Sequence, residues 1–85
     1  MANVAKTFTT NNFLPDATTG KYVYSLGVSE TGISTQNYRV AKLLRKDSSE
    51  NYHNVILAYE IFADKHLEIY SDEPFDGKLV LVTDT

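Results

Sequence analysis

Alternation of apolar and polar side chains recurs along the chain and predicts strands. Between residues 21 and 28 every second side chain (Tyr22, Tyr24, Leu26 and Val28) is apolar, which is the two-residue period of a half-buried strand. Residues 66–70 and 78–83 show the same period in shorter runs. Residues 6–10 predict a short edge strand, and the Ser-Glu-Thr-Gly run at 29–32 predicts a turn.

The segment 38–46 fits two elements. As a strand, it would place Tyr38, Val40, Lys42 and Leu44 on one side. As a helix over 35–46, it would form an apolar stripe along Tyr38, Ala41 and Leu44, capped by Ser34 or Thr35. The pattern leaves both open.

Residues 54–62 also fit both periods, and their neighbours favour a strand. Large side chains stand at every odd position, which is typical of a central strand buried on both faces. A hairpin-length connection follows at 63–66, and a loop with Pro and Asp-Gly follows at 71–77. The strands 54–62, 66–70 and 78–83 should therefore form an antiparallel meander.

These elements predict an all-β fold, a small antiparallel β-sandwich or curled sheet of about six strands. The alternative is an α+β fold with a helix at 35–46. Residues 1–85 should form a single β-domain, with 1–20 a partly extended N-terminal arm and a turn after Phe13-Leu14-Pro15. The expected core consists of Tyr22, Tyr24, Leu26, Val40, Val55, Leu57, Tyr59, Ile61, Leu67, Ile69, Leu79 and Leu81.

The amino-acid composition favours strands, and the short chain without cysteine favours association with another molecule. Val, Ile, Thr, Tyr and Phe, which suit a pleated surface, make up 30 of the 85 residues. A chain of this size buries only about two-thirds of its unfolded surface, and without cysteine it has no disulfide to stabilise it. Oligomerisation or docking on a larger body is the support that remains.

Charge is divided between the two halves of the chain. Residues 1–46 carry a net +4 and residues 47–85 a net −7, which gives the overall −3. Either the halves pair within one fold, or they form opposite surfaces through which one copy attracts the next. The net negative charge disfavours nucleic acid as a partner. No apolar run reaches the roughly 18 residues that a membrane-spanning helix needs.

The polar residues form no catalytic or metal-binding motif. His53 and His66 are the only histidines, without metal-ligand spacing, and we expect them at strand ends, partly exposed. The acidic run 72–76 lacks the spacing of a calcium loop, and Phe75 within it should pack at the edge of the core. No serine has the context of a nucleophile. We therefore predict no catalytic, cofactor-binding or metal residues, and no enzyme activity.

Tyrosines and one basic cluster suggest protein contacts. The six tyrosines combine apolar area with a polar tip, which suits interfaces. The basic cluster Arg39, Lys42, Arg45 and Lys46 could dock an acidic partner. The predicted interface residues are Tyr22, Tyr24, Tyr38, Arg39, Arg45, Tyr70 and Phe75.

The C-terminal third carries a resemblance to a known class of proteins. Residues 52–61 (YHNVILAYEI) and 66–82 (HLEIYSDEPFDGKLVLV) resemble the terminal β-modules of bacteriophage tail-fibre and head-fibre proteins. The resemblance implies a virion structural protein, often trimeric, without a cofactor. A free-standing chain departs from long fibres, which carry a repetitive shaft, so fibre tip, capsid decoration protein and adaptor all stay open.

Three functions follow as expectations. The first is a bacteriophage virion structural protein, located in the virion, that assembles with itself, a trimer being favoured, and with other virion proteins. The second is an inhibitor or regulator whose acidic half binds one host macromolecule. The third is a carbohydrate-recognising module that stacks a glycan on tyrosines.

Overall fold

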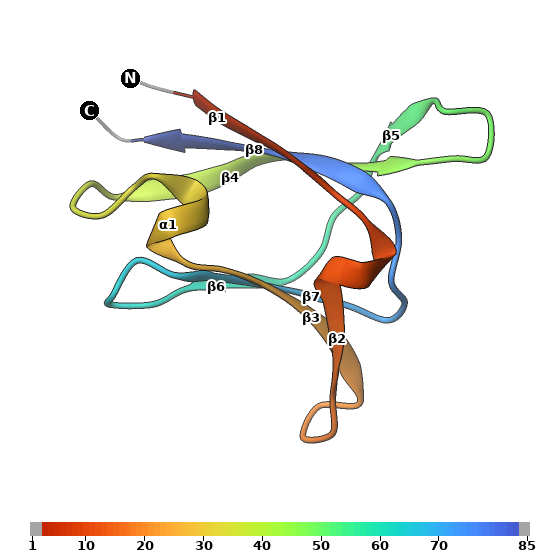
Figure 1. Ribbon diagram of the computed structural model, residues 1–85, viewed down its shortest axis with the longest axis horizontal. Coiled ribbons are helices and arrows are strands. Elements are labelled where there is room, and N and C mark those ends of the chain that lie inside the picture. The colour runs from red at the N-terminus through yellow and green to blue at the C-terminus, as the bar shows by residue number, and fades with distance from the viewer. Residues whose placement is uncertain (1–2, 84–85) are drawn as a thin grey trace.

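Two four-stranded antiparallel sheets pack face to face in the structure, a computed structural model that describes residues 3–83 (Figure 1). The first sheet has the order β1-β8-β4-β5 and the second the order β2-β3-β7-β6. The all-β sandwich prediction is confirmed. The elements are β1 (Asn3–Phe8), η1 (Thr10–Asn12), β2 (Phe13–Asp16), β3 (Lys21–Leu26), α1 (Val28–Thr31), β4 (Tyr38–Lys46), β5 (Tyr52–Asn54), β6 (Tyr59–Ile61), β7 (Leu67–Ser71) and β8 (Gly77–Thr83).

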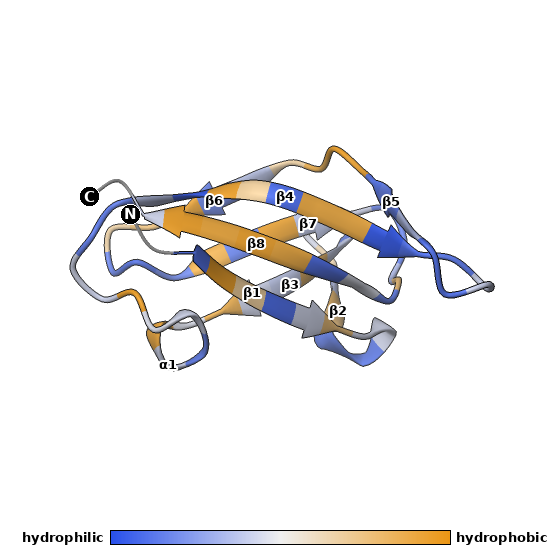
Figure 2. Ribbon diagram, turned by 90° about the horizontal axis from the view of Figure 1, so that it is seen from above, coloured by the Kyte–Doolittle hydropathy of each residue, from blue (hydrophilic) through white to orange (hydrophobic). Residues whose placement is uncertain are grey.

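The strands predicted by clear alternation are present. β3 and β7 pair in the second sheet, and alternate side chains such as Leu26 and Leu67 are fully buried. β8 lies between β1 and β4 in the first sheet, where it is apolar over most of its length (Figure 2). The turn expected at 29–32 includes the single-turn helix α1, which ends at Gly32 with a left-handed backbone.

The ambiguous segment 38–46 is strand β4, so the helical alternative is not adopted. A bulge at Ala41 shifts the register against β8, since Val40 faces Leu81 but Lys42 faces Val80. The extra residue reverses the alternation. Leu43, which is 6 % exposed, therefore points into the core. The prediction that Tyr38, Val40, Lys42 and Leu44 share one side is wrong beyond the bulge.

The predicted central strand 54–62 is wrong, because this stretch contributes a short strand to each sheet. β5 pairs with β4 in the first sheet and β6 pairs with β7 in the second. Residues 55–58 cross between them, with the Val55 N–H donating to the Leu43 carbonyl at 2.9 Å and the Ala58 carbonyl accepting from the Tyr70 N–H at 3.0 Å. Both short strands lie at sheet edges. Tyr59, which we expected in the core, is accordingly 39 % exposed.

The predicted meander is wrong at its second connection. β6 and β7 form the expected hairpin, but β8 belongs to the other sheet. The loop 72–76 therefore crosses the sandwich. Asp76 fixes its end, since its side chain accepts from the Thr10 N–H at 2.9 Å and its carbonyl accepts from the Lys46 N–H at 2.8 Å.

The first 20 residues contribute an outer strand to each sheet. Residues 1–2 of the expected N-terminal arm lie outside the described part of the chain. β1 pairs with β8 over its whole length, and β2 pairs with β3. The turn expected after Pro15 is present at residues 17–20, where the Gly20 N–H donates to the Asp16 carbonyl at 2.9 Å. Pro15 itself is part of β2, an edge strand that tolerates the missing N–H. The strand predicted at 6–10 corresponds to β1 at Asn3–Phe8, so β2 and the division of 54–62 raise the strand number from about six to eight.

Four aromatic rings hold one end of the sandwich together. Phe8 of β1 lies 5.1 Å from Tyr24 of β3 and 5.4 Å from Phe75 of the crossing loop, measured between ring centroids. Phe13 of β2 completes the group, at 5.6 Å from Phe8 and 5.2 Å from Phe75. All four are at most 7 % exposed. Phe75 thus packs in the core, as predicted, and rings from both sheets share one cluster.

Replacing Gly77 by alanine should destabilise this cluster. A Cβ at Gly77 would stand 2.1 Å from the Leu44 carbonyl oxygen and 2.8 Å from Phe8 Cζ. Because neither backbone nor buried ring can move freely, we expect a loss of about 1–3 kcal/mol or more in the free energy of unfolding, measured by urea denaturation. Gly27→Ala is the control, since its Cβ would meet no atom closer than 4.0 Å. Equal stability of the two variants would contradict this packing.

Candidate functional site

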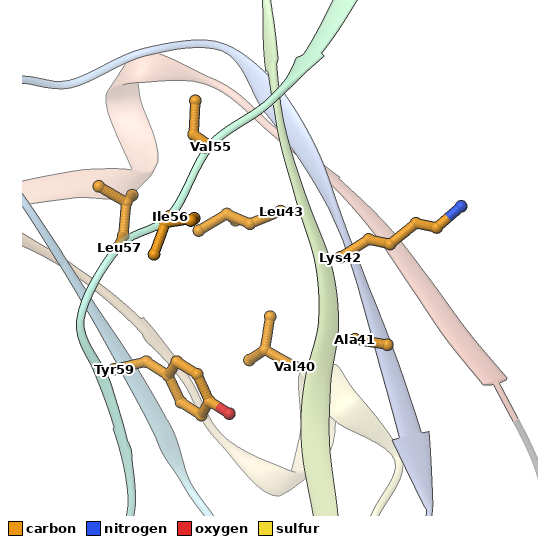
Figure 3. A pocket seen from close by; sticks show the side chains of 8 residues that line it. All are labelled: Val40, Ala41, Lys42, Leu43, Val55, Ile56, Leu57 and Tyr59. Carbon is orange, nitrogen blue, oxygen red and sulfur yellow. The ribbon is translucent and has the colours of Figure 1, made fainter.

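An open apolar groove lies along one side of the sandwich, between β4 and the crossing segment 55–58 (Figure 3). We call it the seam. It has a volume of about 190 Å³ and apolar walls on both sides. Its lining residues are Val40, Ala41, Lys42, Leu43, Val55, Ile56, Leu57 and Tyr59.

The chain forms the seam because the crossing segment keeps a strand-like alternation without a strand partner on its outer side. Val55 and Leu57 are half-buried and pack against the core. Ile56 between them is 99 % exposed, although it is one of the most apolar residue types. Tyr59, at the start of β6, is also exposed. The seam therefore presents apolar surface that a protein partner could cover.

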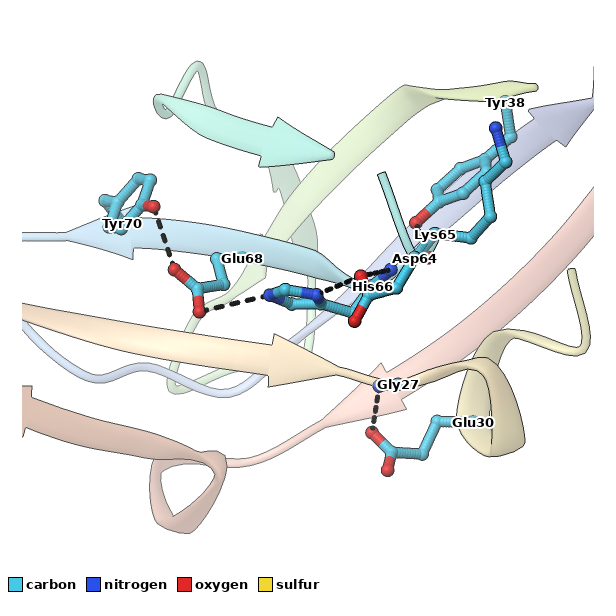
Figure 4. A network of polar contacts seen from close by, with 8 residues as sticks. All are labelled: Gly27, Glu30, Tyr38, Asp64, Lys65, His66, Glu68 and Tyr70. Carbon is cyan, nitrogen blue, oxygen red and sulfur yellow. Dashed lines mark hydrogen bonds and ion pairs between the residues drawn. The ribbon is translucent and has the colours of Figure 1, made fainter. Parts of the chain in front are cut away.

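Three of the predicted interface residues are core residues. Tyr24, Tyr38 and Phe75 are 7 %, 6 % and 4 % exposed, so they offer no surface to a partner. The Tyr38 hydroxyl donates to the Lys65 carbonyl at 2.7 Å, which ties β4 to the hairpin of the other sheet (Figure 4). Burial, and secondarily the charge of Asp64, raises the pKa of Tyr38. These tyrosines stabilise the fold.

The other four predicted residues are dispersed. Tyr22 is half-buried and packs against the core. Tyr70 is half-buried, and its hydroxyl donates to Glu68 Oε1 at 3.0 Å. Desolvation raises the pKa of Tyr70 to about 12, with Glu68 as the next cause. No single surface collects these residues.

The basic cluster predicted from sequence is divided by the fold. Arg45 Nη1 lies 2.6 Å from Glu73 Oε1, and its guanidinium lies 5.2 Å from the centre of the Phe75 ring. Arg45 therefore anchors the crossing loop. Arg39 and Lys42 are exposed elsewhere on β4. Ile56 is not among the interface residues predicted from the sequence. Its only signal there is that it is an apolar residue at an even position of the segment 54–62.

Ion pairs join the two oppositely charged halves of the chain. Lys21 pairs with Asp72, and Arg45 pairs with Glu73, each linking a cation of the first half to a carboxylate of the second. Lys46 and Glu50 do the same at 3.6 Å across the β4–β5 turn. The charge division is thus partly compensated within one molecule.

Both histidines lie beside carboxylates. His66 directly precedes β7, as expected of a strand-end residue, whereas His53 is the middle residue of β5. His53 Nε2 lies 2.7 Å from Asp47 Oδ2, and the His53 side chain is 64 % exposed. His66 precedes β7 and its ring is stacked on Phe62 at 4.1 Å. Its Nδ1 contacts Asp64, and its Nε2 lies 3.4 Å from Glu68 Oε2 (Figure 4). Residues 3–83 contain no group of three His, Cys, Asp or Glu side chains that could hold a metal ion.

Comparison with protein-family models, with curated proteins and with solved structures finds no match for this chain. Within the described part of the chain, no helix is long and apolar enough to cross a membrane. The functional argument therefore rests on the geometry of the seam and of the sheet surfaces.

Protonation of His66 should stabilise the β6–β7 hairpin. The hydrogen bond to Asp64 raises the pKa of His66 above its ordinary value of 6.5. Because the folded-state pKa is the higher one, this contribution is complete below the unfolded pKa near 6.5 and is lost as pH rises through the folded pKa. An NMR titration should give a His66 pKa above 6.5, and Asp64→Asn should lower it.

Glu68→Gln is the matched control, because Glu68 is the weaker of the two carboxylate partners. It should lower the His66 pKa by less than Asp64→Asn does. A larger effect of Glu68→Gln would contradict the geometry of this pair.

Proposed function

We propose that this chain is a structural protein of a bacteriophage virion that acts through protein–protein assembly. It would serve as a fibre-associated, decoration or adaptor component. Its partners would be other copies of itself, with a trimer favoured, and other virion proteins. The proposal involves no cofactor and no catalysis.

The observation that carries this proposal is the seam. Covering a fully exposed isoleucine side chain contributes about 1.5–3 kcal/mol to an association. Ile56 is 99 % exposed and stands beside a groove with further apolar residues. A single exposed apolar residue is ordinary, but one that stands at the rim of an open apolar groove is typical of a contact surface.

The size of the fold supports the same proposal. The two sheets enclose a thin core, and all four outer strands are exposed edges, two of them only three residues long. Domains of this size gain stability from neighbours. An assembled particle would supply such neighbours permanently.

The resemblance to fibre modules supports the virion assignment. It covers residues 52–61 and 66–82, which include β5, β6, β7, the crossing loop 72–76 with the buried Phe75, and most of β8. A segment with this structural role suits a module that ends a fibre with a stable cap. The mass and symmetry of the native assembly, measured by light scattering and by cryo-electron microscopy of the source particle, test the proposal. A monomer that binds no particle would refute it.

Ile56→Ser should weaken assembly without weakening the fold. Because Ile56 is 99 % exposed, its loss should change the free energy of unfolding by less than about 0.5 kcal/mol. Removal of about 1.5–3 kcal/mol of contact energy should weaken association at least tenfold. Sedimentation velocity gives the oligomer affinity, and urea denaturation gives the stability.

Ala63→Ser is the control, since Ala63 is exposed in the β6–β7 turn away from the seam lining. It should leave both measurements unchanged. If Ile56→Ser assembles as tightly as the wild type, the seam is not the contact surface.

A further inference from the structure

The outer face of the first sheet is basic. Its four strands contain no Asp or Glu and hold six of the chain's eight Lys and Arg residues. Two of the six do not belong to the outer face, because Lys6 is opposite the buried Leu79 and Arg45 holds the crossing loop. Side chains directly opposite in an antiparallel pair project to the same side. Lys42 is opposite Val80 and Lys78 is opposite Leu44, so both lysines stand on the outer face. Figure 3 shows Lys42 pointing away from the seam.

The two lysines of this face are available to pair with carboxylates of another molecule. Among residues 3–83, no carboxylate lies within ion-pair distance of Lys42 or Lys78. Leu44 and Val80 lie between them and are half-buried. The face thus combines cations with a partly apolar centre. We call it the basic face.

The outer face of the second sheet carries the opposite charge. Glu60 and Glu68 are directly opposite each other on β6 and β7, and they project outwards because their neighbours Ile61, Leu67 and Ile69 face the core. Like charges in this position are mutually destabilising. Asp16 lines the same surface with Glu60, Glu68 and Tyr70. Lys21 also lines it, but its ammonium group is paired with Asp72. We call this surface the acidic face.

Glu60 has no cation within ion-pair distance among the described residues, and Glu68 has only His66. The carboxylate pair therefore suits lysines from another molecule. Because the two sheets pack through their inner faces, the basic and acidic faces lie on opposite sides of one molecule. They cannot meet within one chain.

We propose that the basic face of one copy docks on the acidic face of a second copy. Charge complementarity carries the inference, because each face offers the charges that the other lacks. Viewed onto the first sheet, the molecule extends over 35 × 20 Å, so a contact between sheet faces lies at the small end of specific interfaces (Figure 2). Opposite faces cannot form a two-fold dimer, so copies stack in an open row. This inference rests on the proposed assembly function and adds a second contact, which adjoins the seam at Lys42.

Variants that neutralise one face at a time test the stacking. The background is Ile56→Ser, which removes the seam contact. Lys42→Gln with Lys78→Gln removes the two lysines of the basic face that have no ion-pair partner among the described residues, and Glu60→Gln with Glu68→Gln removes the facing carboxylate pair of the acidic face. Neither change removes a core side chain, so unchanged thermal unfolding serves as the folding control.

In the Ile56→Ser background with both faces intact, the mass from light scattering should rise with protein concentration and fall as salt is added. Each face variant alone should stay monomeric. Mixed in equal amounts, they should form a complex of two chains and no larger species, because only one complementary pair of faces remains.

Three results would overturn the stacking. The first is a background protein that is monomeric at all concentrations. The second is a face variant that associates as strongly as the background. The third is a duplex DNA probe that binds the wild type and is lost with the two lysines while the mass stays unchanged, which would make the basic face a polyanion site. Ile56-dependent assembly or particle binding would still support the proposed function in each case.

Discussion

The aromatic cluster of Phe8, Phe13, Tyr24 and Phe75 is the contact on which the rest of the fold depends. Its rings come from β1, β2, β3 and the loop between β7 and β8, so one cluster joins both sheets. Gly77 follows the loop where the Phe8 ring and the Leu44 carbonyl leave no space for a Cβ. The path of the chain from β7 in the second sheet to β8 in the first therefore follows from ring packing.

The same arrangement explains why the molecule has an open side. The rings gather where β1, β2 and the crossing loop meet, whereas the seam at β4 is closed only by residues 55–58. This segment has one hydrogen bond to each sheet at its ends and leaves Ile56 outside. A thin sandwich has too few apolar side chains to close both sides, so its uncovered side is the natural place for a partner.

The candidate surfaces followed from sequence only in part. Tyrosine content suggested interfaces, but Tyr24 and Tyr38 face inwards on strands whose other side is polar, so they are core residues. Arg45 resembled its basic neighbours in sequence, yet its side chain holds Glu73 and Phe75. The pattern could not reveal these outcomes, because exposure depends on which face of a strand meets the other sheet. The uneven charge was visible in the sequence, and its separation onto two outer faces depends on how the strands are distributed between the sheets.

The amino-acid sequence by itself determined the β class, the alternation in β3, β7 and β8, and the hairpin at 63–66, because these depend on side chains close together in the chain. Tertiary structure decided the rest. The bulge at Ala41 turned the Leu43 side chain into the core. Residues 54–62 are divided between the two sheets because β5 pairs with β4 and β6 pairs with β7. Which strands pair depends on contacts between residues far apart in the sequence. The local alternation of side chains predicts a strand, but it does not predict the partner of that strand.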